Sequence, residues 1–245
     1  MSLETMFDKA AANAAPVAAI TIRRPDDWHV HLRDGAMLSA VLPFTAAQFA
    51  RGIIMPNLVP PVTTVEAASD YRDRILAARP QNSDFQPLMT CYLTDMTAPD
   101  EIARGHAEGV WVAAKLYPAG ATTNAHHGVT DIPALAPVLE RMERIGMPVL
   151  IHGESTDPEV DIFDREAVFM ERSLLPLLKR DAGVKVVIEH ATTAETLDIV
   201  RAHATRAAAT LTPHHLVINC TSIFQGGLQP HLYCLPVAKR ERHRL

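Results

Sequence analysis

The stretch Val149-Leu150-Ile151-His152 is a short apolar run that ends in a histidine. A polar or metal-binding side chain stands in the same way at or beside the end of an apolar run in the stretches 28–34, 53–57, 112–116 and 186–190. Parallel strands that alternate with helices all end on one rim, and an α/β barrel places its chemistry on that rim. The five stretches therefore predict a barrel whose polar strand ends meet.

The composition is that of one globular domain. The chain has 245 residues, 48% of them hydrophobic, which is enough for a sizeable core. A net charge of −5 without a basic block argues against nucleic acid or an anionic membrane as a partner. The three cysteines are widely spaced and odd in number, which favours a reducing cytoplasm. No apolar stretch approaches the length of a membrane span.

Seven short apolar runs are predicted to be strands buried on both faces, at 28–32, 52–56, 87–93, 110–116, 148–152, 184–189 and 207–212. Helical patterns lie between most of them, at 64–78, 132–145, 165–179 and 193–203. This order predicts parallel pairing with right-handed crossovers, as in a (β/α)8 TIM-type barrel. A closed barrel has eight strands, so we expect an incomplete α/β barrel of about seven β/α units in which the eighth strand is missing.

The domain organisation is expected to be simple. Residues 1–19 are alanine-rich and lack the pattern of a signal peptide, so we expect a loosely ordered tail. Residues 20–245 form the barrel domain, which we expect to be truncated at its C-terminal end. The longest irregular stretch, 117–129, follows a predicted strand and is rich in Pro, Gly and Thr, which favours a mobile loop over the active site.

His29 and His31 are the first candidate ligands. They are two residues apart on a predicted strand, so both side chains point to one face and can reach one metal ion. Two histidines on a half-exposed strand without any metal are an equally good interpretation of this spacing alone.

Lys115 ends the run Trp111-Val112-Ala113-Ala114, where a charged amine would be desolvated. Burial lowers the pKa of a lysine and leaves a neutral nucleophilic amine. Such an amine can take up carbon dioxide to form a carbamate, whose two oxygens suit a bridge between two cations. A lysine that extends to the solvent at the rim, or one that forms a Schiff base, remains open.

His152 and His190 end two further apolar runs. Each alone would more often be a structural histidine, but with His29, His31 and Lys115 they make five ligands that converge on one rim. Nitrogen and oxygen ligands of this kind favour divalent ions, zinc first. Two such ions would polarise a carbonyl and hold a hydroxide between them.

Arg33 and Asn57 are expected on the same rim. Arg33 can hold a carboxylate through two parallel hydrogen bonds, and Asn57 can add a third. The alternative for Arg33 is a surface ion pair with Asp34 or Asp26.

With these residues in place, the chain resembles the dihydroorotases of the short bacterial type, members of the amidohydrolase superfamily. The resemblance runs from about residue 20 to residue 245, and its matching stretches are 23–35, 55–57, 60–64, 113–118, 151–154, 161–166, 189–190, 212–215 and 230–236.

The resemblance implies an α/β barrel with two zinc ions. His29, His31 and a carboxylated Lys115 would hold one ion, and Lys115, His152 and His190 the other. The remaining roles it implies are substrate binding by Arg33, Asn57 and the backbone of Leu235, and a loop over the substrate with Thr122 and Thr123. It further implies a homodimer that interconverts N-carbamoyl-L-aspartate and L-dihydroorotate in pyrimidine synthesis.

The sequence departs from the family pattern in one respect. The family continues with an eighth strand that ends in Gly-Thr-Asp-Ser-Ala-Pro-His, whose aspartate binds the first metal and carries the proton. The general acid/base Asp is not present in this chain. Two alternatives therefore stay open beside a dihydroorotase: another cyclic amidohydrolase of the dihydropyrimidinase or allantoinase kind, and an inactive metal-binding remnant.

Overall fold

The fold is known from a computed structural model that describes residues 19–181 and 183–245. The tail expected over residues 1–19 therefore lies, apart from residue 19, outside the described residues. Within the described part, no helix has both the length and the apolar character needed to cross a bilayer.

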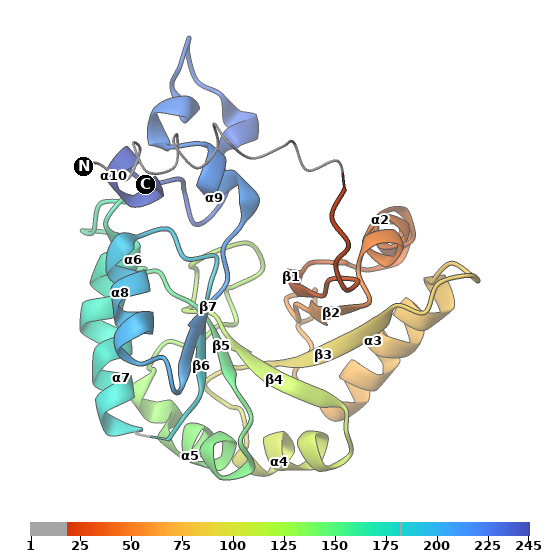
Figure 1. The fold of residues 1–245 in the computed structure, drawn as a ribbon. Coiled ribbons are helices and arrows are strands. Elements are labelled where there is room, and N and C mark those ends of the chain that lie inside the picture. Colours follow the sequence, from red (N-terminus) through yellow and green to blue (C-terminus); the bar gives the residue numbers. More distant parts are fainter. Residues whose placement is uncertain (1–18, 182) are drawn as a thin grey trace.

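The core of the structure is one parallel sheet whose strands follow one another in sequence order. Its strands are β1 (Asp27–Val30), β2 (Arg51–Ile54), β3 (Gln86–Tyr92), β4 (Trp111–Leu116), β5 (Val149–His152), β6 (Val186–Glu189) and β7 (Ala207–Ala209). Figure 1 shows the sheet curling into an open barrel. Neither β1 nor β7 has a strand on its outer edge within 19–181 and 183–245. The prediction of an incomplete seven-stranded α/β barrel is confirmed.

Helices connect the strands and cover the outer face of the sheet (Figure 1). They are α2 (Gly35–Gln48), α3 (Val65–Ala78), α4 (Pro99–Ala107), α5 (Ala136–Ile145), α6 (Arg165–Phe169), α7 (Leu175–Arg180) and α8 (Ala194–Ala202). A 3-10 turn, η1 (Pro133–Leu135), precedes α5, and a π-helical turn, η2 (Met170–Leu174), joins α6 to α7.

The residues after β7 form a cap at the end of that strand (Figure 1). This C-terminal cap, residues 213–245, consists of the short elements α9 (Pro213–Val217), η3 (Cys220–Ile223), η4 (Pro230–Leu232) and α10 (Glu241–Arg244). A backbone hydrogen bond joins the two halves of the cap: the amide of Cys220 donates to the carbonyl of Lys239 at 2.9 Å.

Helix ends follow the expected capping chemistry. The Thr193 side chain accepts a hydrogen bond from the amide of Thr196 at the start of α8, and Thr64 caps α3 in the same way through Ala67. Gly146 ends α5 with φ 71°, a left-handed conformation that favours glycine. These caps explain why the predicted starts of α3 and α8 and the end of α5 lie within a residue or so of the observed ones.

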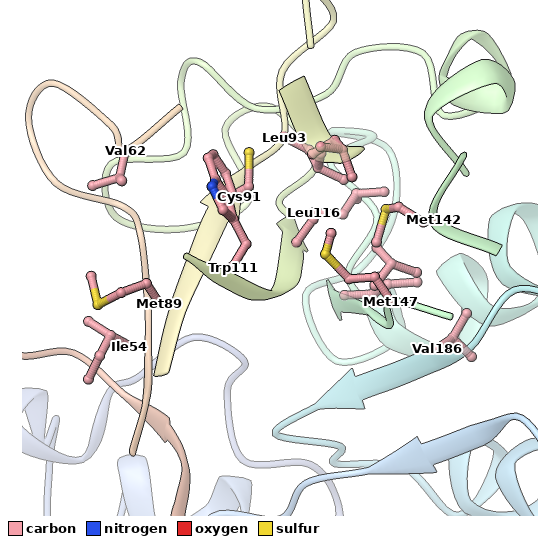
Figure 2. Close-up of a cluster of buried hydrophobic side chains, with 14 of the residues drawn as sticks. Ile54, Val62, Met89, Cys91, Leu93, Trp111, Leu116, Met142, Met147 and Val186 are labelled. Carbon is pink, nitrogen blue, oxygen red and sulfur yellow. The ribbon is translucent and has the colours of Figure 1, made fainter. Parts of the chain in front are cut away.

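Both faces of the sheet are buried along β5 and nearly so along β6, whereas β1 has no buried residue, so the expectation that every strand is buried on both faces is wrong for this edge strand. On the outer face, large side chains of β3 and β4 such as Met89 and Trp111 pack in one core cluster with Met142 of α5 (Figure 2). A smaller cluster of Met55, Ala113 and Leu150 packs with two partly buried side chains from β2 and β6. Each large side chain buried in this way contributes about 1.5–3 kcal/mol, so the curved sheet is a stable platform for the residues at its rim.

Candidate active site

The first histidine pair lies at the end of β1. His29 is in the strand and His31 follows the strand by one residue; their Nε2 atoms are 3.2 Å apart. The Nδ1 atom of each ring is buried and makes no hydrogen bond within the described part of the chain. Two imidazole nitrogens this close to each other either share a proton in a hydrogen bond or bind the same cation.

Lys115 of β4 lies beside this pair with its side chain fully buried. Its Nζ atom contacts the carboxylate of Glu189 at the end of β6, and the other Glu189 oxygen is 2.9 Å from Nδ1 of His29. Burial lowers the pKa of Lys115 well below its usual value. The alternative in which Lys115 extends into solvent is wrong, because its amine is buried beside the Glu189 carboxylate.

His152 and His190 complete the group. His152 ends β5, and its ring centre is 4.7 Å from that of His190, which in turn is 5.1 Å from the ring of His29. His190 has φ 44°, a left-handed conformation that is strained for a histidine, and its amide donates to Oγ1 of Thr210 at 2.8 Å. The strained backbone turns the ring toward the other histidines, so the four imidazoles form one continuous cluster.

The cluster is held in its neutral form. Burial lowers the pKa of His29 and the pKa of His190 well below the usual value of a histidine. Burial and the nearby Arg33 lower the pKa of His31 to about 3. Burial also lowers the pKa of His152. Neutral imidazoles are the form that binds metal ions.

The donor set fits divalent cations. Ligand atoms of His29, Glu189 and His190 all lie within 4.8 Å of one another. Among the described residues, the buried Nδ1 atoms of His31 and His190 have neither a hydrogen bond nor an ion-pair contact, and Lys115 Nζ and His29 Nδ1 have only their contacts with Glu189. Buried polar atoms are rarely left without a partner, so their concentration here is the sign of a missing ligand. Nitrogen and oxygen donors in this arrangement suit zinc or a similar ion.

A cavity of about 250 Å³ opens onto the cluster. The histidine side is formed by His29, His31, His152 and His190, and the opposite wall by the C-terminal cap. The other lining residues are Tyr117, Thr122, Thr212, His214, His215, Cys234, Leu235 and Pro236. Its volume is at the small end for ligand sites, which limits a ligand to a compact molecule.

Arg33 lies next to the cluster and has no ion-pair partner among the described residues. Asp26 pairs with Arg51 at 2.6 Å and Asp34 with Arg74 at 2.9 Å, so the alternative of a surface pair between Arg33 and either aspartate is wrong. One guanidinium nitrogen of Arg33 is buried and makes no hydrogen bond in the described residues. Its φ is 58° and its carbonyl accepts from the Tyr71 hydroxyl at 2.7 Å. Arg33 is therefore fixed in place with donor capacity to spare.

Asn57 joins the rim to the loop over residues 117–129. Its side-chain amide donates to the carbonyl of Thr123 at 2.9 Å, and the side chain of Asn124 donates back to the Asn57 carbonyl at 3.0 Å. The Oδ1 atom of Asn57 is buried and unbonded within the described residues. Thr122 reaches the cavity, whereas Thr123 is exposed and contributes only its backbone here. Asn57 thus contacts the loop in this conformation.

Three buried charged residues near the site did not stand out in the sequence as site residues. Glu189 contacts Lys115, Glu154 accepts from His152 Nε2 at 3.0 Å, and Lys239 lies 3.6 Å from Glu154. Glu154 and Glu189 each stand within two residues of a predicted ligand, which is the signal that could have found them. Nothing in the local sequence marks Lys239.

Comparison with known proteins agrees with this geometry. A model of the amidohydrolase family matches residues 22–237. The chain belongs to the amidohydrolase family. This amidohydrolase is 65% identical over 226 residues to a dihydroorotase of Sphingopyxis alaskensis and 62% identical over 226 residues to one of a Synechococcus species. Each match covers 92% of the chain but only 66% and 65% of the two relatives, so the amidohydrolase spans about two thirds of their length.

Solved structures give the same result. The dihydroorotase of Campylobacter jejuni superposes with a TM-score of 0.82 at 38% identity, over 89% of this amidohydrolase and 63% of that chain. The dihydroorotase of Saccharomyces cerevisiae, solved with 5-fluoroorotic acid, has a TM-score of 0.79 at 31% identity, over 90% and 63% of the two chains. An L-hydantoinase of Arthrobacter aurescens shares the fold at 16% identity, with a TM-score of 0.72. The likeness to dihydroorotases therefore goes beyond the fold.

Proposed function

We propose that this amidohydrolase, over residues 20–245, carries the metal centre of a dihydroorotase, which interconverts N-carbamoyl-L-aspartate and L-dihydroorotate in pyrimidine synthesis. The observation that supports this most directly is that His29, His31, His152 and His190 line one small cavity, with the fully buried Lys115 beside them. Relatives of 62–65% identity that are dihydroorotases support the choice of substrate.

Two zinc ions are the proposed cofactors. His29, His31 and a carboxylated Lys115 would hold one ion, and Lys115, His152 and His190 the other. The ions supply polarisation of a carbonyl and acidification of water. The chain contributes neutral imidazoles, a buried amine free to take up carbon dioxide, and a cavity too small to leave much water around the reacting amide.

Substrate binding is proposed for Thr122 and Leu235, which line the cavity, and for residues of the rim beside the histidine cluster. Arg33 would hold the substrate carboxylate through its spare guanidinium donors. Asn57 would add a hydrogen bond, and Leu235 would contact the ring through its backbone. Thr122 and Thr123 would close over the substrate. A carboxylate clamp favours a charged ring such as dihydroorotate over the uncharged rings of hydantoinase-type enzymes.

The test is an assay of ring opening and ring closure, followed by ultraviolet absorbance, with zinc and bicarbonate present. L-dihydroorotate should be hydrolysed, orotate should inhibit, and dihydrouracil and allantoin should be turned over far more slowly. Preference for either uncharged ring would overturn the substrate assignment. A chain that aggregates and binds no zinc would favour the alternative of an inactive remnant.

The proton carrier is a separate part of the proposal. No Gly-Thr-Asp occurs in the 245 residues. A positioned general acid/base contributes about 10²–10⁴-fold in rate. We expect the 245-residue chain to be slower by about that factor than the same chain fused to a segment that supplies Gly-Thr-Asp. Equal rates for the two proteins would show that another residue carries the proton.

A cytoplasmic homodimer is proposed as well. The location is supported by the odd number and wide spacing of the cysteines. The dimer is supported only by the resemblance, and sedimentation of the purified chain at micromolar concentration tests it directly. A single monomer-sized boundary would contradict it.

A further inference from the structure

The C-terminal cap contributes one buried lysine, Lys239, to a contact with Glu154, the carboxylate that bonds His152. Lys239 belongs to the C-terminal cap, yet its side chain is only 1% exposed. Its Nζ atom donates to the carbonyl of Val237 at 3.0 Å and lies 3.6 Å from a carboxylate oxygen of Glu154, whose side chain is 2% exposed. A fully buried lysine and carboxylate are costly to desolvate and are retained only with each other's charge for compensation.

The other carboxylate oxygen of Glu154 contacts one of the four clustered histidines. It accepts a hydrogen bond from Nε2 of His152 at 3.0 Å. A carboxylate can only accept, so this contact places the proton of the neutral ring on Nε2 and leaves Nδ1 as the lone-pair nitrogen. Nε2 faces Glu154, and Nδ1 is therefore the nitrogen left for a cation. Outer hydrogen bonds of this kind fix the tautomer and orientation of metal-binding histidines.

The cap is connected to the cavity wall as well as to Glu154. The segment that ends in Lys239 begins with Cys234, Leu235 and Pro236, which line the cavity. The Pro236 carbonyl contacts Nε2 of His215 at 2.8 Å. The segment 234–239 thus lines the cavity and also supplies the positive charge that faces Glu154, the carboxylate bonded to His152.

We propose that Lys239 and Glu154 are a positioning pair for His152, in which Glu154 sets the imidazole tautomer and Lys239 supplies the counter-charge that allows a carboxylate to be buried there. The pair links the cap to the second cation position of the metal centre. The assignment rests on the proposed function only in naming His152 as a ligand; the tautomer itself is a property of the metal-free chain.

The experiment measures that tautomer directly. Long-range proton–nitrogen NMR spectra of the histidine-labelled, metal-free chain distinguish the two tautomers, and His152 is assigned from the signals lost in H152Q. The wild-type ring should carry its proton on Nε2. A proton on Nδ1 in the wild type would overturn the proposal without any variant.

The test variant replaces both charges by apolar groups of similar size, as E154L/K239M, because removing a buried pair together is far milder than removing one member. His152 should then show both tautomers. In a titration with zinc ions alone against a chromophoric chelator, one zinc-binding step should weaken by about 10–100-fold. An unchanged tautomer together with unchanged zinc binding would overturn the proposal.

Two controls separate positioning from general damage. The matched double variant D26L/R51M removes another ion pair with a buried aspartate, away from the cavity, and should leave the His152 tautomer unchanged. The single variant K239M should melt at a lower temperature than E154L/K239M, because it leaves a carboxylate buried without its counter-charge. Since none of these readouts needs turnover, an inactive chain with the expected tautomer would defeat the proposed function and not the positioning pair.

Discussion

At the scale of single residues, the site is a group of basic side chains kept neutral by burial. His31 shows the consequence most simply, because burial and the nearby Arg33 bring its pKa to about 3 in the folded chain. An unfolded histidine titrates near 6.5. The unfolded chain therefore binds a proton at this residue between about pH 6.5 and pH 3 that the folded chain does not, and stability falls as the pH falls through this window.

We expect the metal-free chain to lose stability on acidification partly through His31. The contribution of this residue approaches about 1.4 kcal/mol per pH unit below pH 6.5. Urea unfolding at pH 7.5, 6.5, 5.5 and 5.0 should therefore show a shallower decline for H31N than for the wild type. Equal slopes for the two proteins would contradict the lowered pKa.

Lys115 gives a second prediction at this scale. Its amine is fully buried and in contact with Glu189, so methionine can replace it without leaving a new hole. K115M loses the bridging ligand and should melt at a lower temperature than the wild type, because it leaves the Glu189 carboxylate buried without its partner. Its zinc content should fall below that of the wild type, and any turnover should drop by at least about 100-fold. The control K185M removes a lysine near Gly146, far from the cavity, and should leave zinc content unchanged. Full zinc content in K115M would exclude the bridging role.

At the scale of elements, the loop between β6 and α8 is held by one buried carboxylate. Glu166 of α6 accepts hydrogen bonds from the amides of Thr192 and Thr193 at 2.9–3.0 Å and from the hydroxyls of both residues and of Thr196. This loop begins directly after the strained His190. The carboxylate thus fixes the backbone that aims a proposed zinc ligand.

Removal of that carboxylate should therefore affect both stability and metal binding. E166A leaves two buried amides without an acceptor, at about 1–3 kcal/mol for each. We expect a loss of about 2–6 kcal/mol in the free energy of unfolding and weaker zinc binding. T196V, which removes one hydroxyl and leaves the Glu166 carboxylate in place, is the milder control. A variant E166A as stable as the wild type would contradict this role for Glu166.

The elements also show what the sequence could and could not predict. Strands buried on both faces leave unbroken apolar runs, and these located all seven strands to within a few residues. Helix α2 was not predicted, because Pro43 interrupts it and its exposed side chains include Met37 and Phe44, so it has no amphipathic period. Helix α4 was not predicted either, because Ala98 offers no side-chain cap at its start and Gly105 lies within it, whereas α8 of the same length begins at the capping Thr193.

In the candidate site, too, some residues were predicted from the sequence and some contacts were not. The five predicted ligands were visible because each stands in or directly after an apolar run. In the structure the four histidines line one cavity and Lys115 is buried beside them. The partnership of Glu154 with Lys239 was not visible, because it joins β5 to the cap across a distance in sequence that no local pattern encodes. Asn57 was expected to face a substrate, and its contact with Thr123 depends on a loop conformation that sequence periodicity cannot give.

At the scale of the whole molecule, the open sheet sets the order of local stability. Within the described residues β1 and β7 each pair on one side only, whereas β3, β4 and β5 pair on both. A cavity of about 590 Å³ is lined by residues of β1 and by the segment from Ala209 to Pro213. The edge strands therefore have fewer hydrogen bonds and a more accessible backbone than the central ones.

Hydrogen exchange should reproduce this order. We expect amides of β4 and β5 to exchange only through global unfolding, and amides of β1 and β7 to exchange through smaller openings that cost less free energy. Because β1 carries His29, zinc should slow exchange in β1 more than in β7, whose described residues contain no proposed ligand. Mass spectrometry of peptic fragments with and without zinc measures both effects. Uniform protection across the seven strands would mean that the edges are covered, and zinc protection confined to β7 would place the cation away from the histidine cluster.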